Sequence, residues 1–212
     1  MDGIKTIIWD WNGTLLDDTL ICKSIINKLL EQRSLPVLSL QKYKEIFTFP
    51  VKDYYQKAGF DFTQEEFKIP ADDFIVRYTE KVKLAKLHHE ATEVLEYLKS
   101  SNVQQFILSA MEQNSLKKSI EQFGINHYFN AIYGISDHYA HSKTANAIRL
   151  ISDYHLNPSE VCFIGDTVHD HEVAETIGCN CILIADGHQT KKRLIATGRI
   201  VYDSLNQLKK DF

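Results

Sequence analysis

The 212-residue sequence is poor in the residues that build linkers, disulfide scaffolds or membrane spans. Its 4 prolines and 9 glycines leave little material for a flexible linker between domains. Its 4 cysteines include no C-x-x-C pair and are too sparse for a disulfide scaffold, so we expect reduced thiols and a cytoplasmic location. No apolar run approaches the roughly 18 residues that span a bilayer, so we expect no membrane association.

An excess of positive charge is also absent. Lys and Arg total 24 against 28 Asp and Glu, a formal net charge of −4. A mildly acidic chain argues against a broad, non-specific grip on nucleic acid, and we expect no nucleic-acid partner. Hydrophobic residues make up 44% and charged residues 25%, which excludes wholesale disorder. The length suits one large domain with a small insert.

Short apolar runs alternate with helix-length segments in most of the chain. The runs cover residues 4–9, 105–108, 131–135, 161–164 and 181–184. Each is apolar along most of its length, which is typical of strands covered on both faces. Segments of helix length lie between the later runs. The alternation predicts an α/β fold with a Rossmann-like parallel sheet and helices on both faces.

The first run is followed by about 80 residues without a convincing strand, a spacing outside the usual βαβ rhythm. Apolar residues recur at helical spacing early in this stretch, for example at Ile21, Ile25 and Leu29. We therefore predict a helical cap domain over residues 16–86, inserted into a core domain of residues 1–15 and 87–212. An aromatic set in the insert is predicted to form the cap core, with one or two members lining a substrate pocket. The set comprises Phe47, Phe49, Tyr54 and Tyr55.

Ligands of open parallel sheets bind at the carboxyl ends of the strands, so the residues there are the first site candidates. Polar side chains follow several of the predicted strands, and a lysine opens the helix after the third. The polar residues are Asp10, Asn12 and Thr14 after the first run, Ser109 after the second, Lys143, and Asp166 and Asp170 after the fourth, with Gly13 and Ala110 next to them in the chain. The topology predicts that these residues meet at one place.

Such a set suits phosphoryl transfer. Asp10 is placed to attack phosphorus and form an aspartyl phosphate. Because two anions repel each other, a cation must screen them, and the carboxylates of Asp10 and Asp166 are the hard oxygen ligands that Mg²⁺ prefers. Ser109 and Lys143 are expected to hold phosphate oxygens. Gly13 lets the backbone pass close to the phosphate.

Four motifs in this chain resemble those of the haloacid dehalogenase superfamily. The segment from Asp10 to Thr14 is similar to its first motif, D-x-D-G-T, and residues 165–170 are similar to its fourth, G-D-x-x-x-D. Ser109 resembles the second motif and Lys143 the third. The order agrees over nearly the whole chain, and a helical insert directly after the first motif resembles the C1 cap of this superfamily. The sequence is most similar to the phosphoglycolate phosphatase-like branch.

The resemblance implies a role for each matching position. Asp10 would be the nucleophile and a metal ligand, and Asp166 would bind the metal with Asp170 beside it. Residue 12 would give its backbone carbonyl to Mg²⁺ and its side chain to acid–base chemistry. Gly13, Thr14, Ser109, Ala110 and Lys143 would contact the substrate. The implied function is a Mg²⁺-dependent phosphatase of a small phosphorylated metabolite.

Asn12 departs from the motif, because phosphatases of this superfamily carry Asp there. An amide cannot shuttle the proton, and a general acid contributes about 10²–10⁴-fold. We therefore expect weak activity on alkyl phosphates and better activity on aryl phosphates, acyl phosphates or anhydrides, whose leaving groups are stable. Three explanations remain open: a natural Asn12 whose role another group or water fills, an engineered change, or deamidation of the Asn12-Gly13 pair.

Two other functions are compatible with these residues. Phosphonoacetaldehyde hydrolases of the same superfamily lack the second Asp and use a cap lysine, a role that Lys52 could take here. A phosphate-binding module that has lost turnover is the alternative outside enzymes, and Asn12 is its best support.

Four histidines and two neighbouring cysteines are predicted to have structural rather than functional roles. His88, His89, His138 and His141 are predicted to be surface residues. The cysteines that flank the last predicted strand are expected to be buried thiols.

Overall fold

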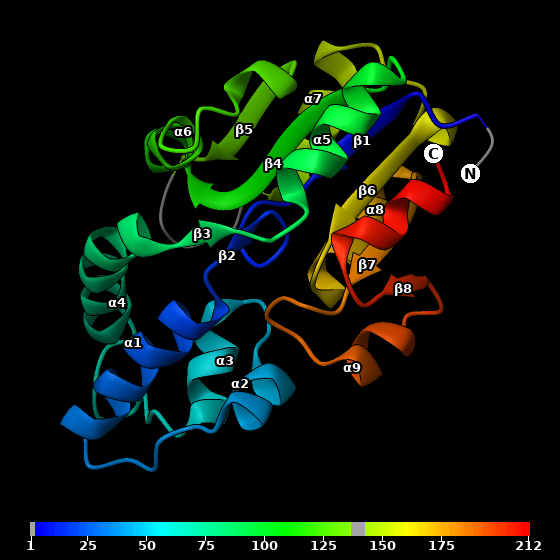
Figure 1. Ribbon diagram of the computed structural model, residues 1–212. Coiled ribbons are helices and arrows are strands. Elements are labelled where there is room, and N and C mark those ends of the chain that lie inside the picture. Colours follow the sequence, from blue (N-terminus) through cyan, green and yellow to red (C-terminus); the bar gives the residue numbers. More distant parts are fainter. Residues whose placement is uncertain (1–2, 137–142) are drawn as a thin grey trace.

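A computed structural model describes residues 3–136 and 143–212 and contains a six-stranded parallel sheet (Figure 1). The strand order is β5-β4-β1-β6-β7-β8. The strands are β1 (Thr6–Trp9), β4 (Gln104–Glu112), β5 (Ala131–Ile135), β6 (Val161–Gly165), β7 (Asn180–Ile184) and β8 (Ile200–Tyr202). The predicted α/β fold with a parallel sheet is confirmed.

Helices cover both faces of this sheet, because alternate strand residues point to opposite sides. In β1, Ile7 and Trp9 pack into one hydrophobic cluster and Ile8 into another, and all three are fully buried. The first cluster includes residues of α5 (Ala91–Ser100), α6 (Gln113–Glu121) and the 3₁₀ helix η4 (Leu205–Lys210). The second includes residues of α7 (Lys143–Asp153), α8 (Val168–Ile177) and α9 (Lys191–Ile195). Shorter 3₁₀ turns are η1 (Val82–Leu84), η2 (Asn126–Tyr128) and η3 (Pro158–Glu160).

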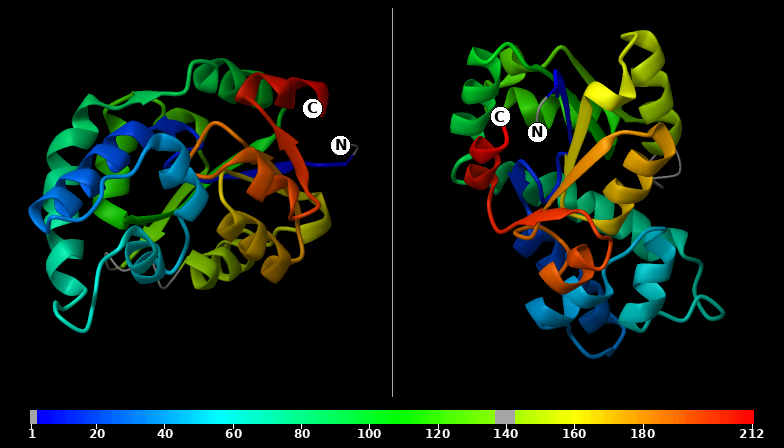
Figure 2. Two further views of the ribbon diagram at one scale, coloured as in Figure 1. Left: turned by 90° about the horizontal axis from the view of Figure 1, so that it is seen from below. Right: turned by 90° about the vertical axis from the view of Figure 1, so that its right-hand side faces the viewer.

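Four further helices form a separate layer at the carboxyl ends of the strands (Figures 1 and 2). They are α1 (Thr19–Gln32), α2 (Leu40–Ile46), α3 (Val51–Ala58) and α4 (Lys68–Lys81). They bury a hydrophobic cluster of their own, which includes Ile25, Leu29 and Tyr55. The layer therefore faces the edge of the sheet where the candidate residues were expected.

Two short strands flank this helical layer and depart from the prediction of helices alone over residues 16–86. β2 (Leu16–Asp17) and β3 (Lys86–Leu87) pair antiparallel, with Leu16 opposite Leu87. A two-residue strand is too short to show a period, so the sequence pattern could not reveal it.

The strand β4 is longer than expected. The prediction ended it at residue 108, whereas it continues to Glu112 with a register shift against β5 between Leu108 and Glu112. Ser109 therefore lies within an irregular strand end. No helix in the described ranges is long and apolar enough to cross a membrane.

Candidate functional site

A buried lysine lies between two carboxylates at the end of β1. Lys143 Nζ donates to Asp10 Oδ1 at 2.5 Å and to Asp170 Oδ1 at 2.6 Å. Asp10 directly follows β1 and Lys143 opens α7, so residues far apart in sequence meet here. All three side chains are nearly inaccessible to solvent. Burial of this kind is tolerated because each charge has a partner.

Backbone and hydroxyl groups hold the two later carboxylates. Asp170 closes a capping box with Thr167 at the start of α8, and its Oδ2 accepts from the Thr167 backbone N–H at 2.9 Å and hydroxyl at 2.7 Å. Asp166 Oδ1 accepts from the Thr14 hydroxyl at 3.0 Å, and Oδ2 accepts from the His188 backbone N–H at 2.5 Å. Thr14 therefore contacts Asp166.

Two glycines leave room for Asp166. Gly13 has a φ of +77°, and a Cβ there would lie 2.4 Å from Asp166 Oδ2. A Cβ on Gly187 would lie 2.1 Å from the same oxygen. Any side chain at either position would displace the carboxylate.

The three carboxylates crowd together and oppose one another electrostatically. Asp10, Asp166 and Asp170 offer oxygens that all lie within 4.8 Å of one another. Burial, with smaller contributions from the other two carboxylates, raises the pKa of Asp10 to about 8, although Lys143 lowers it. Burial likewise raises the pKa of Asp166 to about 6. Burial opposes the charge on Asp170 as well, but Lys143, with smaller contributions from Thr167 and His169, holds that pKa below its usual value. Hard oxygens in excess of nearby positive charge fit Mg²⁺.

Asn12 is part of a second hydrogen-bond network beside this cluster. Its Nδ2 donates to Asp18 Oδ2 at 2.9 Å and to the Tyr78 hydroxyl oxygen at 2.6 Å. The Tyr78 hydroxyl in turn donates to Asp18 Oδ2 at 2.6 Å. Ser109 Oγ donates to Asn12 Oδ1 at 3.4 Å. The amide nitrogen of Asn12 thus faces Asp18, and its oxygen faces Ser109.

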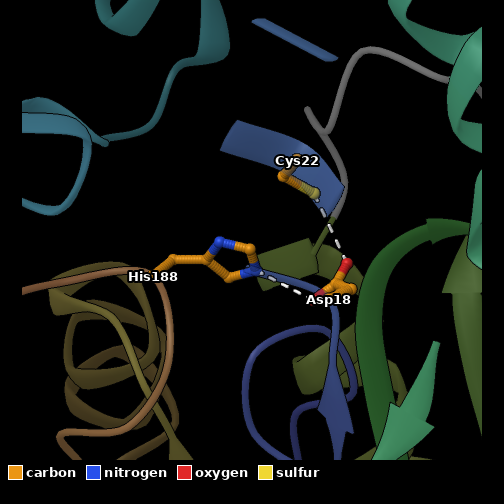
Figure 3. Close-up of side chains that lie close together, drawn as sticks. All are labelled: Asp18, Cys22 and His188. Carbon is orange, nitrogen blue, oxygen red and sulfur yellow. Dashed lines mark hydrogen bonds and ion pairs between the residues drawn. The ribbon is translucent and has the colours of Figure 1, made fainter. Parts of the chain in front are cut away.

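His188 and Cys22 approach Asp18 from two other sides (Figure 3). His188 Nε2 lies 3.1 Å from Asp18 Oδ1, and its Nδ1 lies 2.8 Å from the Tyr43 hydroxyl. Burial disfavours a charge on His188, but Asp18, with smaller contributions from Asp166 and Asp10, raises the pKa to about 9. Cys22 Sγ donates to Asp18 Oδ2 at 3.5 Å, and burial raises the pKa of this thiol. Because the thiol stays protonated and both Asp18 oxygens accept hydrogen bonds, we interpret this group as a hydrogen-bond network around a buried ion pair.

A cavity of about 200 Å³ opens above both networks. Its polar floor consists of Asp10, Asn12, Asp18, Ser109, Lys143, Thr167 and His188. Its aromatic wall consists of Tyr43, Phe47, Phe49, Tyr54, Tyr55, Phe67, Phe74 and Tyr78. All four aromatic residues singled out in the sequence belong to this wall.

The structure brings the candidate residues other than Lys52 together, but Gly13 and Thr14 are not among the residues that line the cavity. Asp10, Asn12, Ser109, Ala110 and Lys143 line the cavity. Lys52 does not: it is exposed on α3, and its Nζ lies 5.9 Å from the centroid of the Phe62 ring.

Several residues of the site were not found by sequence reasoning. Asp18 and Tyr78 lie in the insert, where no motif marks them. His188 follows β7 by four residues, so the rule of strand ends could have indicated it.

The predictions for the histidines are partly wrong, and those for the cysteines agree with the structure. The surface interpretation of His88 is wrong, because this side chain is buried and its Nε2 lies 3.1 Å from the Gly13 carbonyl oxygen. His89 is exposed, as expected. His138 and His141 lie outside the described residues. The cysteines Cys179 and Cys181 are free and buried, as expected.

The family model of haloacid dehalogenase-like hydrolases matches residues 7–184. The chain belongs to this family and is an enzyme of the hydrolase class, as the motifs predicted. A search of curated proteins found no significant match.

Solved structures share the fold over the whole chain. A haloacid dehalogenase-like hydrolase from Streptococcus pneumoniae is 20% identical, with a TM-score of 0.84 and 100% of both chains covered. A predicted phosphoglycolate phosphatase from Haemophilus somnus is 21% identical, with a TM-score of 0.79 over 100% of this chain and 99% of the other. Protein tyrosine kinase A from Mycobacterium tuberculosis is 17% identical, with a TM-score of 0.82 over 100% and 99%. These likenesses establish the fold, which carries more than one named activity.

Proposed function

We propose that this hydrolase is a Mg²⁺-dependent phosphatase that cleaves a small phosphate monoester through an aspartyl phosphate on Asp10. The observation that carries the proposal is the buried Lys143 ammonium held between Asp10 and Asp170 on the floor of a cavity. A nucleophilic carboxylate, an adjacent cation and hard oxygen ligands are the groups that phosphoryl transfer requires.

Each polar residue of the cavity floor has a separate role in the proposed reaction. A carboxylate oxygen of Asp10 attacks phosphorus, and the ester P–O bond breaks with its electron pair on the leaving oxygen. Water then hydrolyses the acyl phosphate, which releases phosphate and restores Asp10. Lys143 and Ser109 orient the phosphate oxygens.

Mg²⁺ would be held by Asp10, Asp166, Asp170 and the backbone carbonyl of Asn12, and when bound it supplies positive charge between the phosphate and the nucleophile. The raised pKa of Asp10 supports this assignment, because in the metal-free cluster the ionised nucleophile is disfavoured.

We further propose that residues 16–86 act as a cap domain on a core of residues 1–15 and 87–212. The cap contributes the aromatic wall and Asp18, and so would exclude water and select the substrate. The Lys52 chemistry is not proposed, because Lys52 does not reach the cavity.

Phosphate release from phenyl phosphate, with and without Mg²⁺, tests the proposal. We expect Mg²⁺-dependent release that Asp10→Ala abolishes, while Asp53→Ala, at an exposed position of α3, retains it. Rapid quenching with ³²P-labelled ester should give hydroxylamine-sensitive label on the wild type alone. A protein that binds Mg²⁺ and phosphate but releases none from any ester would instead be a phosphate-binding module.

A further inference from the structure

Three hydroxyls of the cavity wall are committed within the protein, whereas the buried Tyr54 hydroxyl has no hydrogen-bond partner among the described residues. The hydroxyls of Tyr78 and Tyr43 bond to Asp18 and His188, and the Thr79 hydroxyl donates to the Ile75 carbonyl at 2.8 Å. Phe47, Phe74 and the other aromatic residues present ring surfaces. A ligand on this wall therefore meets mainly apolar faces, which favour a flat apolar group.

The charges around the cavity disfavour a second anion. Within the described part of the chain, Lys143 and His188 are the only cationic side chains that line it, and carboxylates already hold both. Glu112 adds a further acidic side chain to the lining. Lys143 and the metal serve the phosphate, so a carboxylate elsewhere on the substrate would be buried without a partner.

The size of the cavity limits the ligand. A volume of about 200 Å³ is below the ~300–1,000 Å³ typical of drug-sized ligands. Beside a phosphate, such a space suits one ring rather than a fused or linked pair.

Asn12 adds an independent constraint from the chemistry. Without a carboxylic acid at this position, the leaving oxygen departs unprotonated. A phenol, with a pKa near that of tyrosine at about 10, leaves far more readily as an anion than an alkanol. The missing acid and the aromatic wall thus favour the same leaving group.

Resting on the proposed phosphatase activity, we propose that the substrate class is the phosphate monoester of an uncharged, single-ring phenol. The ring lies on the aromatic wall while the phosphate lies at Lys143 and Ser109. Asp10 displaces the phenolate, which takes the P–O electron pair and gains its proton from solvent water. The net reaction consumes one water and yields the phenol and inorganic phosphate. Phosphoglycolate, which carries a carboxylate and an alkyl leaving group, falls outside this class.

Two pairs of esters, assayed with the Mg²⁺-loaded wild type, test the effect of a substrate carboxylate, one pair with aryl and one with alkyl leaving groups. Phenyl phosphate and 4-carboxyphenyl phosphate differ by one carboxylate, and we expect kcat/KM at least about tenfold higher for phenyl phosphate, mainly through KM. Benzyl phosphate and phosphoglycolate both have alkyl leaving groups, and we expect a KM about tenfold lower for benzyl phosphate. Equal or better kcat/KM for either carboxylated ester, with phosphate release intact, overturns the substrate class and leaves the phosphatase standing. No release from any ester overturns both.

A cation placed in the wall gives a second, independent readout. Ile75 lines the cavity, whereas its neighbour Val76 is 61% exposed and does not. Ile75→Arg should improve the kcat/KM ratio of 4-carboxyphenyl to phenyl phosphate about tenfold, and Val76→Arg should leave it unchanged. If Ile75→Arg does not fold, Thr79→Lys at an exposed position that also lines the cavity serves the same purpose. An unchanged ratio in a folded wall variant contradicts the charge argument.

Discussion

Asn12 donates its side-chain amide to Asp18, with 2.9 Å between Asn12 Nδ2 and Asp18 Oδ2. The amide is matched to a neighbour that accepts only. A carboxylate in its place would face Asp18 at hydrogen-bond distance, and two carboxylates this close cannot both ionise without cost. The contact therefore suits an amide at position 12 better than a carboxylate.

Exchanging the two side chains tests that match. Asn12→Asp should raise kcat/KM for benzyl phosphate at least about tenfold, and for phenyl phosphate far less, because it restores a proton donor. The crowded carboxylates should also lower the free energy of unfolding by about 1–3 kcal/mol. Adding Asp18→Asn should recover most of that stability in urea unfolding, with Asp18→Asn alone as the control. Equal gains on both esters would remove the missing-acid explanation.

The buried carboxylate of Asp10 is expected to be required for turnover but to lower the stability of the metal-free protein. The pKa of Asp10 is raised from 3.8 to about 8 in the fold. The free energy of unfolding of the metal-free protein should therefore fall as the pH rises from 3.8 towards 8. Asp10→Asn should therefore abolish turnover yet, without metal at pH 8, unfold with a free energy higher by on the order of 1–3 kcal/mol. Saturating Mg²⁺ should reverse the order of the two proteins. A metal-free variant less stable than the wild type at pH 8 would contradict the carboxylate crowding.

Gly187 is expected to determine the position of Asp166. Gly187→Ala would place a Cβ 2.1 Å from Asp166 Oδ2, so we expect weaker Mg²⁺ binding. Metal at 100 times its Kd stabilises a protein by about 2.7 kcal/mol, and this gain in thermal unfolding should shrink in the variant. Gly124→Ala is the control: its φ is +67° with nothing within 4 Å of a Cβ, so it should lose about 1 kcal/mol while keeping the Mg²⁺ response.

The His188–Asp18 ion pair predicts a contribution to stability that is lost as the pH rises, whereas the contribution of a paired acid is lost as the pH falls. The pKa of His188 is raised to about 9 in the fold. Its contribution is therefore complete below the unfolded value of about 6.5 and is lost as the pH rises through 9. The difference in unfolding free energy between wild type and His188→Gln should be largest at pH 6 and vanish above pH 9. A difference independent of pH would assign His188 a packing role alone.

The chemistry of the floor could be predicted from the sequence because it follows strand ends. Asp10 and Asp166 come directly after apolar runs, and parallel topology brings such positions together. Lys143 could be predicted because it stands at the start of the helix that follows the third predicted strand. Asp18 could not be recognised in this way, since its role depends on Tyr78, which lies sixty residues further along. Helical spacing shows which face of a helix is apolar, but not which distant helix it meets.

The wall was only partly predictable for a related reason. Phe47 and Tyr54 look like core residues in the sequence, because aromatic side chains in a helical segment are usually buried. Tyr54 is buried and Phe47 partly buried, but both also border the cavity, and the sequence does not distinguish a core position from a cavity position. His88 was misjudged because nothing in the sequence distinguishes it from its exposed neighbour His89, and only the β2–β3 pairing places His88 against the Gly13 loop.

The β2–β3 pairing also has a consequence for how this enzyme could be rebuilt. Leu16 and Leu87 are neighbours across that short ladder, so everything threaded between them starts and finishes at adjacent points. Segments with such closely spaced ends tolerate replacement well. A different helical module spliced in at this junction would bring new selectivity to an unaltered reaction centre, provided that it restores an acceptor for Asn12.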